Sequence, residues 1–155
     1  MKKIMFNDKY GLTQAVLKGR KTQTRRILLP HTVQELRNGN DYQEVIRLYS
    51  GYKVREEVAV AQKYKDIALD MPIELAAELI KQPGWNNKMF VKADLMPHHI
   101  RITNIRVERL QDISEDDCLK EGIWRDDNVG LEGTTYWYHG LANSSLRTAK
   151  EAYAS

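Results

Sequence analysis

The sequence offers no means of cross-linking itself and no segment suited to crossing a membrane. Cys118 is the single cysteine among the 155 residues, so an internal disulfide is excluded and a reducing compartment is expected. No apolar run has the length of a membrane span, and the apolar stretch near the N-terminus ends at Phe6, too early for a signal peptide. We therefore predict a cytoplasmic protein without a membrane partner.

Sequence signatures of several common sites are also missing. The chain has neither a phosphate-binding loop nor the glycine pattern of dinucleotide-binding folds. His98 and His99 are adjacent, so on a strand they would face opposite sides, and no cysteine or carboxylate lies near them at a metal-ligand spacing. We predict no metal and no cofactor.

The composition that is present fits a folded domain. Apolar residues make up 42% of the chain and charged residues 29%, enough for a packed interior and a solvated surface. The 24 basic and 21 acidic residues give a net charge of +3, which says little about partners. We predict a single domain over residues 1–155, with loop insertions at 31–53 and 125–142. The first insertion is expected to contain a short helix from Tyr42 to Tyr49.

Hydrophobic periodicity predicts an α+β fold of short elements. Strands are predicted over residues 2–6, 22–29, 54–64, 88–93 and 99–110 and near 136–139. Helices are predicted over residues 8–18, 72–81, 114–121 and 144–154. The helix over 114–121 has the clearest boundaries, because Ser114 can cap its start and Gly122 stops it. The helix over 144–154 has no stop signal, as expected if the natural chain continues beyond Ser155.

Two of the predicted strands indicate a closed sheet. Residues 54–64 carry small or apolar side chains on both faces, as a central strand does. The apolar alternation of residues 99–110 reverses its phase at Thr103-Asn104, which a β-bulge would produce. Bulges of this kind bend strands into barrels, so we expect a small barrel.

The segment from Gly19 to Arg26 is the first candidate site. It follows a predicted helix end, where backbone groups lack partners, and it combines several cations with two threonine hydroxyls and no acidic residue. Such a set suits phosphate or the polar edge of a nucleobase. The alternative is a solvated basic connection between a helix and a strand, which is the commoner role of a charged run.

This segment resembles the entry motif of ASCH domains. The run AVLKGRKTQTRR places Gly19, Lys21, Thr24 and Arg26 in the pattern Gly-x-Lys-x-x-Thr-x-Arg, and IRITNIRVERLQDISEDDCLKEGI resembles the later strand and short helix of phage-borne and prophage-borne members. In VREEVAVAQKY, between the two blocks, Arg55 stands where the family has a glycine. The resemblance implies a PUA-like small β-barrel with flanking short helices and a cleft that binds RNA or a modified nucleoside.

Some small members of this family are similar to an amidohydrolase that removes the acetyl group from acetylated cytidine with a Lys, a Thr and a Glu. The resemblance places these roles on Lys21, Thr24 and Glu121. A threonine hydroxyl is a poor nucleophile until a base takes its proton, and a lysine can be that base only if burial or neighbouring cations lower its pKa. Glu121 would then relay protons or activate water.

The spacing of the first two residues sets a condition on this hypothesis. Lys21 and Thr24 are three positions apart, so a regular strand would direct their side chains to opposite faces. They can share a site only if residues 20–23 form a turn or a bulge. The catalytic hypothesis therefore requires such a bend.

Three functions stay open at this point. The first is a module that binds RNA or a nucleoside-like small molecule in a basic polar cleft, with Arg20, Arg25 and Arg26 as ligand-binding cations and Trp124 and Tyr136 as stacking platforms. The second is the amidohydrolase acting on an N-acylated nucleoside. The third is a phage accessory protein that acts through protein contacts, with the motif serving structure alone.

Overall fold

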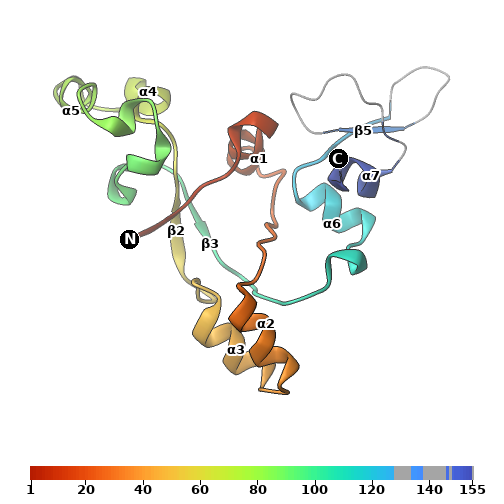
Figure 1. Cartoon of the computed structure of the whole chain (residues 1–155). Helices are drawn as coiled ribbons and strands as arrows, with labels where there is room; N and C mark the ends of the chain where they lie inside the picture. Colours follow the sequence, from red (N-terminus) through yellow and green to blue (C-terminus); the bar gives the residue numbers. More distant parts are fainter. Residues whose placement is uncertain (128–133, 138–145, 147, 155) are drawn as a thin grey trace. The chain divides into compact units, whose positions relative to one another are not determined.

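The computed structural model describes residues 1–127, 134–137, 146 and 148–154 (Figure 1). The chain is of mixed α and β structure and divides into two compact units. Unit 1 comprises Met1–Phe6 and Gly39–Arg106, and unit 2 comprises Asn7–Asn38 and Val107–Ser155. Each unit is described by itself below, and the predicted single-domain organisation stays a prediction.

Unit 1 is built on a three-stranded sheet in the order β1 (Lys2–Ile4), β2 (Glu57–Val60) and β3 (His99–Arg101). Strand β1 runs parallel to β2, and β3 runs antiparallel to it. Three of the four residues of β2 are buried, so both of its faces are covered. This is the central strand that small and apolar residues on both faces predict.

Short helices follow the strands of unit 1. They are α3 (Tyr42–Tyr49), α4 (Tyr64–Ile67) and α5 (Ile73–Leu79), with 3-10 turns at Ala68–Asp70, Pro83–Trp85, Lys88–Phe90 and Ala93–Leu95. The buried core of this unit is Ala59, Ala61, Tyr64, Ile67, Leu79, Val91 and Met96. Tyr64 has the largest fully buried side chain among the described residues: its hydroxyl accepts the backbone N–H of Lys92, and a β-carbon on Gly84 would clash with its ring.

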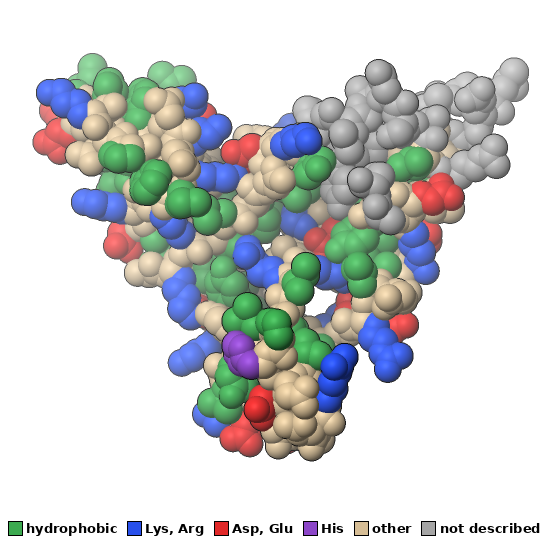
Figure 2. All heavy atoms as spheres, viewed as in Figure 1, with side chains coloured by type: hydrophobic (Ala, Val, Ile, Leu, Met, Phe, Trp, Pro, Cys, Tyr) green, Lys and Arg blue, Asp and Glu red, His purple; other side chains and the backbone are tan. Residues whose placement is uncertain are grey.

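Large apolar side chains are nevertheless exposed on unit 1. Green side chains gather at the surface over α4 and α5 in Figure 2. Leu69 is fully exposed, and Ile73 and Ile80 are more than half exposed. Contiguous exposed apolar surface is typical of contacts with other molecules.

Unit 2 is mainly helical. After a 3-10 turn at Asp8–Tyr10 it contains α1 (Leu12–Leu17), α2 (Pro30–Arg37), a 3-10 turn at Leu110–Asp112, α6 (Glu115–Lys120), the antiparallel pair β4 (Trp124–Asp126) and β5 (Thr135–Trp137), and α7 (Ala149–Ala154). Helices α6 and α7 pack together around Ile113, Cys118, Ile123, Ala149 and Ala152. The carboxylate of Glu115 accepts the N–H of Ala149 and so joins the starts of these two helices.

The predicted closed barrel is not formed by the described residues, whose strands make one open sheet of three and one pair. Residues 22–29 form no strand, and Pro30 begins α2 instead of ending a strand, because its fixed φ suits the first position of a helix. Strand β3 ends at Arg101, so the expected bulge farther along is absent. Residues 88–93 turn instead of extending, since the Asn87 side chain accepts the N–H of Met89.

The predicted insertion at 31–53 is largely helical rather than a loop. It contains nearly all of α2 and the whole of α3, whose predicted bounds from Tyr42 to Tyr49 are confirmed. Asp41 caps α3 by accepting the N–H of Glu44. The described residues of 125–142 are 125–127 and 134–137, most of which lie in β4 and β5. The rest of this predicted insertion lies outside the described residues, as does the start of the helix predicted over 144–154. None of the described helices has the length and apolar character needed to traverse a bilayer.

Candidate functional site

The segment after α1 connects the carboxyl ends of two helices. Gly19 has φ +71° and ends α1. The backbone N–H groups of Arg20 and Lys21 donate to the carbonyl of Ala15, and those of Thr22 and Gln23 donate to the carbonyl of Lys120 at the end of α6. Carbonyls at helix ends lack partners inside their own helix. Residues 20–23 satisfy two of these carbonyls and are thereby held in place.

A buried ion pair lies directly beneath this connection. The Nζ of Lys21 donates to Oε2 of Glu121 at 2.5 Å and to the backbone carbonyl of Glu121 at 2.8 Å. The two side chains are 3% and 5% exposed. Glu121 is the C-cap of α6, and Gly122 follows it with φ +102°. The structure therefore brings together two of the three residues to which the resemblance gives catalytic roles.

Arg25 extends the ion pair into a network. Its Nη1 donates to Oε1 of Glu121 at 3.0 Å, so both oxygens of this carboxylate are occupied. Its Nη2 pairs with Glu108 and lies 3.4 Å from Oδ2 of Asp117. Gln23 donates from Nε2 to Oδ1 of the same Asp117 at 2.9 Å. Three side chains of the segment are thus bound to carboxylates.

Burial alternates along the segment in step with these bonds. Lys21, Gln23 and Arg25 are buried or half-buried and are bound to carboxylates, whereas Thr22 and Thr24 are exposed. Arg26 is exposed as well. Residues 20–29 contain no turn, helix or strand, so the segment shows the two-sided alternation of extended backbone.

The alternation shows that the bend required for Lys21 and Thr24 to share a catalytic site is not formed. Lys21 lies on the inward face and Thr24 on the outward face, and the bend over residues 20–23 is absent. Within the described residues no hydrogen bond joins the Thr24 hydroxyl to Lys21 or Glu121. The structure does not bring Thr24 to the other two residues of the predicted catalytic set.

The remaining predicted ligand-binding residues are engaged inside unit 2. The guanidinium of Arg20 stacks on the ring of Trp124, 3.9 Å from its centroid, and donates from Nη1 to the carbonyl of Gly122. Trp124 is therefore covered on one face. Tyr136, on β5, packs against the core of α6 and α7. Neither aromatic is presented as an open stacking platform.

Burial and neighbouring charges shift the pKa of three cations. Burial lowers the pKa of Lys21, and the carboxylate of Glu121 only partly opposes this, while Arg25 and Arg26 lower it further. Burial also lowers the pKa of Arg20. For Arg25, burial opposes the charge but the bonds to Glu108 and Glu121 outweigh it, so the pKa is raised.

Two acidic partners of the segment, Glu108 and Asp117, are the residues that sequence reasoning missed. Lys21 and Arg25 face Glu108, Asp117 and Glu121, so the predicted basic cleft is neutralised on its inward side. Asp117 lies in the first turn of α6, where the sequence predicts local roles for it in a capping box with Ser114 and at the positive end of the helix dipole. The sequence separation between these acids and the cations hides the pairing. Among the described residues no group of three metal-ligating side chains comes together.

Comparisons with known proteins identify no relative of this chain. No protein-family model, no curated protein and no solved structure gives a significant match to the chain. The interpretation of the site therefore depends on the residues and contacts of this chain.

Proposed function

We propose that this chain is an ASCH-like protein of the PUA-like superfamily that binds RNA or a modified nucleoside through the outward face of residues 19–26. The observation that carries the proposal is the alternation of this segment, which fixes Lys21 and Arg25 inward and presents Thr22, Thr24 and Arg26 to solvent. The entry motif supports the family assignment, because its glycine, lysine, threonine and arginine are all present in this segment.

The outward face offers chemistry that suits a nucleoside. Two hydroxyls can each donate and accept, and a guanidinium can bind a phosphate or the edge of a guanine in a bidentate manner. Along an extended backbone, successive outward side chains are about 6.6 Å apart, so three of them form a continuous row. Because residues 20–23 are held on two helix ends, the row is positioned before a ligand arrives.

The inward cations are poor candidates for direct phosphate binding. An anion at Lys21 or Arg25 would have to displace Glu121, whose two carboxylate oxygens are already bound. We therefore assign the phosphate contact to Arg26. One such contact on a single strand predicts a slope of about −0.7 for the logarithm of affinity against the logarithm of salt concentration.

The test is a titration of single-stranded RNA and of modified nucleosides, followed by fluorescence anisotropy or calorimetry at several salt concentrations. Arg26→Gln is expected to weaken RNA binding and to flatten the salt slope, and Thr24→Ala is expected to weaken binding without changing the slope. Arg47→Gln on α3 is the matched control, since Arg47 is an exposed helical arginine of unit 1. Equal affinity in Arg26→Gln and the wild type would refute this assignment.

An amidohydrolase is the second candidate, and the buried pair of Lys21 and Glu121 favours it. A lysine whose pKa is lowered beside a carboxylate is suited to accepting a proton. Hydrolysis would require Thr24 to turn inward, so that its hydroxyl attacks the acyl carbon while Lys21 takes the proton. The amide C–N bond would then break, the nucleobase amine would leave with the proton that Lys21 returns, and water would hydrolyse the acyl ester on Thr24 to release the carboxylic acid. The test is incubation with N-acylated nucleosides: turnover that Thr24→Ser retains and Thr24→Ala and Lys21→Ala lose supports this candidate, whereas no turnover by the wild type removes it.

A further inference from the structure

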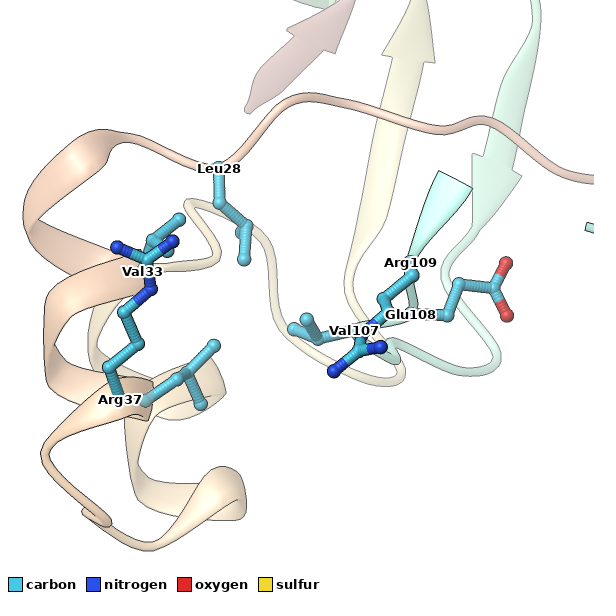
Figure 3. Close-up of a pocket in the computed structure, with 7 residues that line it drawn as sticks. Leu28, Val33, Arg37, Val107, Glu108 and Arg109 are labelled. Carbon is cyan, nitrogen blue, oxygen red and sulfur yellow. The ribbon is translucent and has the colours of Figure 1, made fainter. Parts of the chain in front are cut away.

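Unit 2 contains a hollow whose lining shares one residue, Glu108, with the ion-pair network. It has a volume of about 480 Å³ and lies between α2 and residues 107–109 (Figure 3). Leu28, Val33, Leu36 and Val107 form its apolar wall, and all four are half-buried. Figure 3 shows the Leu28 side chain directed into the space between α2 and this segment. Pockets for small molecules are of this size and of this apolar character.

The charged residues around the hollow leave it positive. Arg37, in the last turn of α2, and Arg109 both line it. In the part of the chain that the structure describes, neither arginine forms an ion pair. The third charged lining residue is Glu108, but its carboxylate is directed away from the hollow in Figure 3 and is bound by Arg25. An apolar wall is thus combined with two guanidinium groups that no carboxylate of the described chain neutralises.

We propose that this hollow binds a small organic anion with a hydrocarbon body, such as a medium-chain carboxylate. The four aliphatic side chains would cover the hydrocarbon, and Arg37 and Arg109 would bind the anionic group through charge-assisted hydrogen bonds. The lining contains no aromatic ring and no amide side chain, which are the groups that stack on a nucleobase or read its edge. This chemistry favours an aliphatic anion over a nucleotide.

The experiment is calorimetric titration of the full chain with octanoate, with the neutral octanol and with adenosine monophosphate. Octanoate is expected to bind with a dissociation constant below about 1 mM, and octanol at least about tenfold more weakly, because charge-assisted hydrogen bonds contribute about that factor. Arg37→Gln and Arg109→Gln should each weaken octanoate binding about five- to tenfold. Both arginines are exposed, so these variants are expected to fold.

Arg47→Gln is the matched control, because Arg47 lies in the last turn of the eight-residue helix α3 as Arg37 lies in that of α2. It should leave octanoate binding unchanged, and so should Arg26→Gln, which separates this site from the proposed RNA-binding face. The proposal is overturned if octanoate does not bind, if octanol binds equally well, if adenosine monophosphate binds more tightly than octanoate, or if neither arginine variant weakens the binding.

Discussion

Lys21 and Glu121 are 100 positions apart in the sequence, and the amine of one lies 2.5 Å from the carboxylate of the other. The same amine also bonds the backbone carbonyl of Glu121 at the end of α6. The pair therefore binds the inward face of the 19–26 segment to the end of a helix. In this arrangement the outward threonines and Arg26 are exposed to solvent.

Substitutions of the two residues of this ion pair are expected to lower stability by different amounts. Glu121→Gln leaves the buried amine of Lys21 and the guanidinium of Arg25 facing a neutral amide, which should lower the free energy of unfolding by about 3 kcal/mol. Lys21→Met leaves Glu121 bound to Arg25, so the loss should be about 1 kcal/mol. Urea unfolding measures both values. Equal losses, or a larger loss in Lys21→Met, would contradict the network as described.

Stability should also rise with pH in the range directly below 10.5. The pKa of Lys21 is lowered from 10.5 in the folded chain, chiefly by burial, and returns to its ordinary value on unfolding. Between the two values the unfolded chain binds a proton that the folded chain does not, so the free energy of unfolding increases with pH. The measurement compares the wild type with Lys21→Met, in which this contribution is absent. If the free energy of unfolding of the wild type instead fell relative to that of Lys21→Met as the pH rises, the pKa of Lys21 would be raised in the folded chain, contrary to this prediction.

Two glycines of the site give a matched pair of substitutions. Both have positive φ, +71° at Gly19 and +102° at Gly122. A β-carbon at Gly19 would meet nothing within 4 Å, whereas one at Gly122 would lie 3.3 Å from Leu12 and 3.4 Å from Ala15 and Lys21. Gly19→Ala should cost about 1–2 kcal/mol through backbone conformation alone, and Gly122→Ala at least about 1 kcal/mol more. Thermal unfolding of the two variants tests this order, and the reverse order would place Gly122 outside the packed site.

Cys118 provides a probe of unit 2. Its side chain is fully buried in the core between α6 and α7, and burial, helped by Glu115, raises the pKa of the thiol. The native protein should therefore react with a disulfide reagent such as dithiobis-nitrobenzoate only when this core opens, while the unfolded protein reacts at once. Since the sequence has a single cysteine, one rate reports the opening. Full labelling of the native protein within the dead time would mean that this core is not closed.

The parts of the fold that sequence patterns predicted well are those with local signals. Ser114 caps α6 by accepting the N–H of Asp117, and Gly122 ends that helix, as predicted. The strand pairing could not be predicted in the same way, because it depends on partners far along the chain. Residues 22–29 have strand-forming side chains, yet their segment is fixed by bonds to α6 instead of by a neighbouring strand.

Some residues of the candidate site could be predicted from the sequence, and others could not. The motif identified Lys21, and the resemblance identified Glu121, and the two lie in contact. Composition could not show that Glu108 and Asp117 neutralise the basic segment, since no acidic residue lies within it. The spacing of Lys21 and Thr24 did contain the information that they face apart, because alternation is a local property of extended backbone.

The most direct test of the division between inward and outward faces compares two double variants in one RNA-binding titration. Thr24→Ala/Arg26→Gln changes the outward face, and Lys21→Met/Glu121→Gln changes the inward face, each assayed where unfolding curves show the protein to be folded. We predict that the outward variant loses RNA binding at wild-type stability, while the inward variant loses stability and retains binding. Loss of binding in the inward variant, with the outward variant binding like the wild type, would contradict the account.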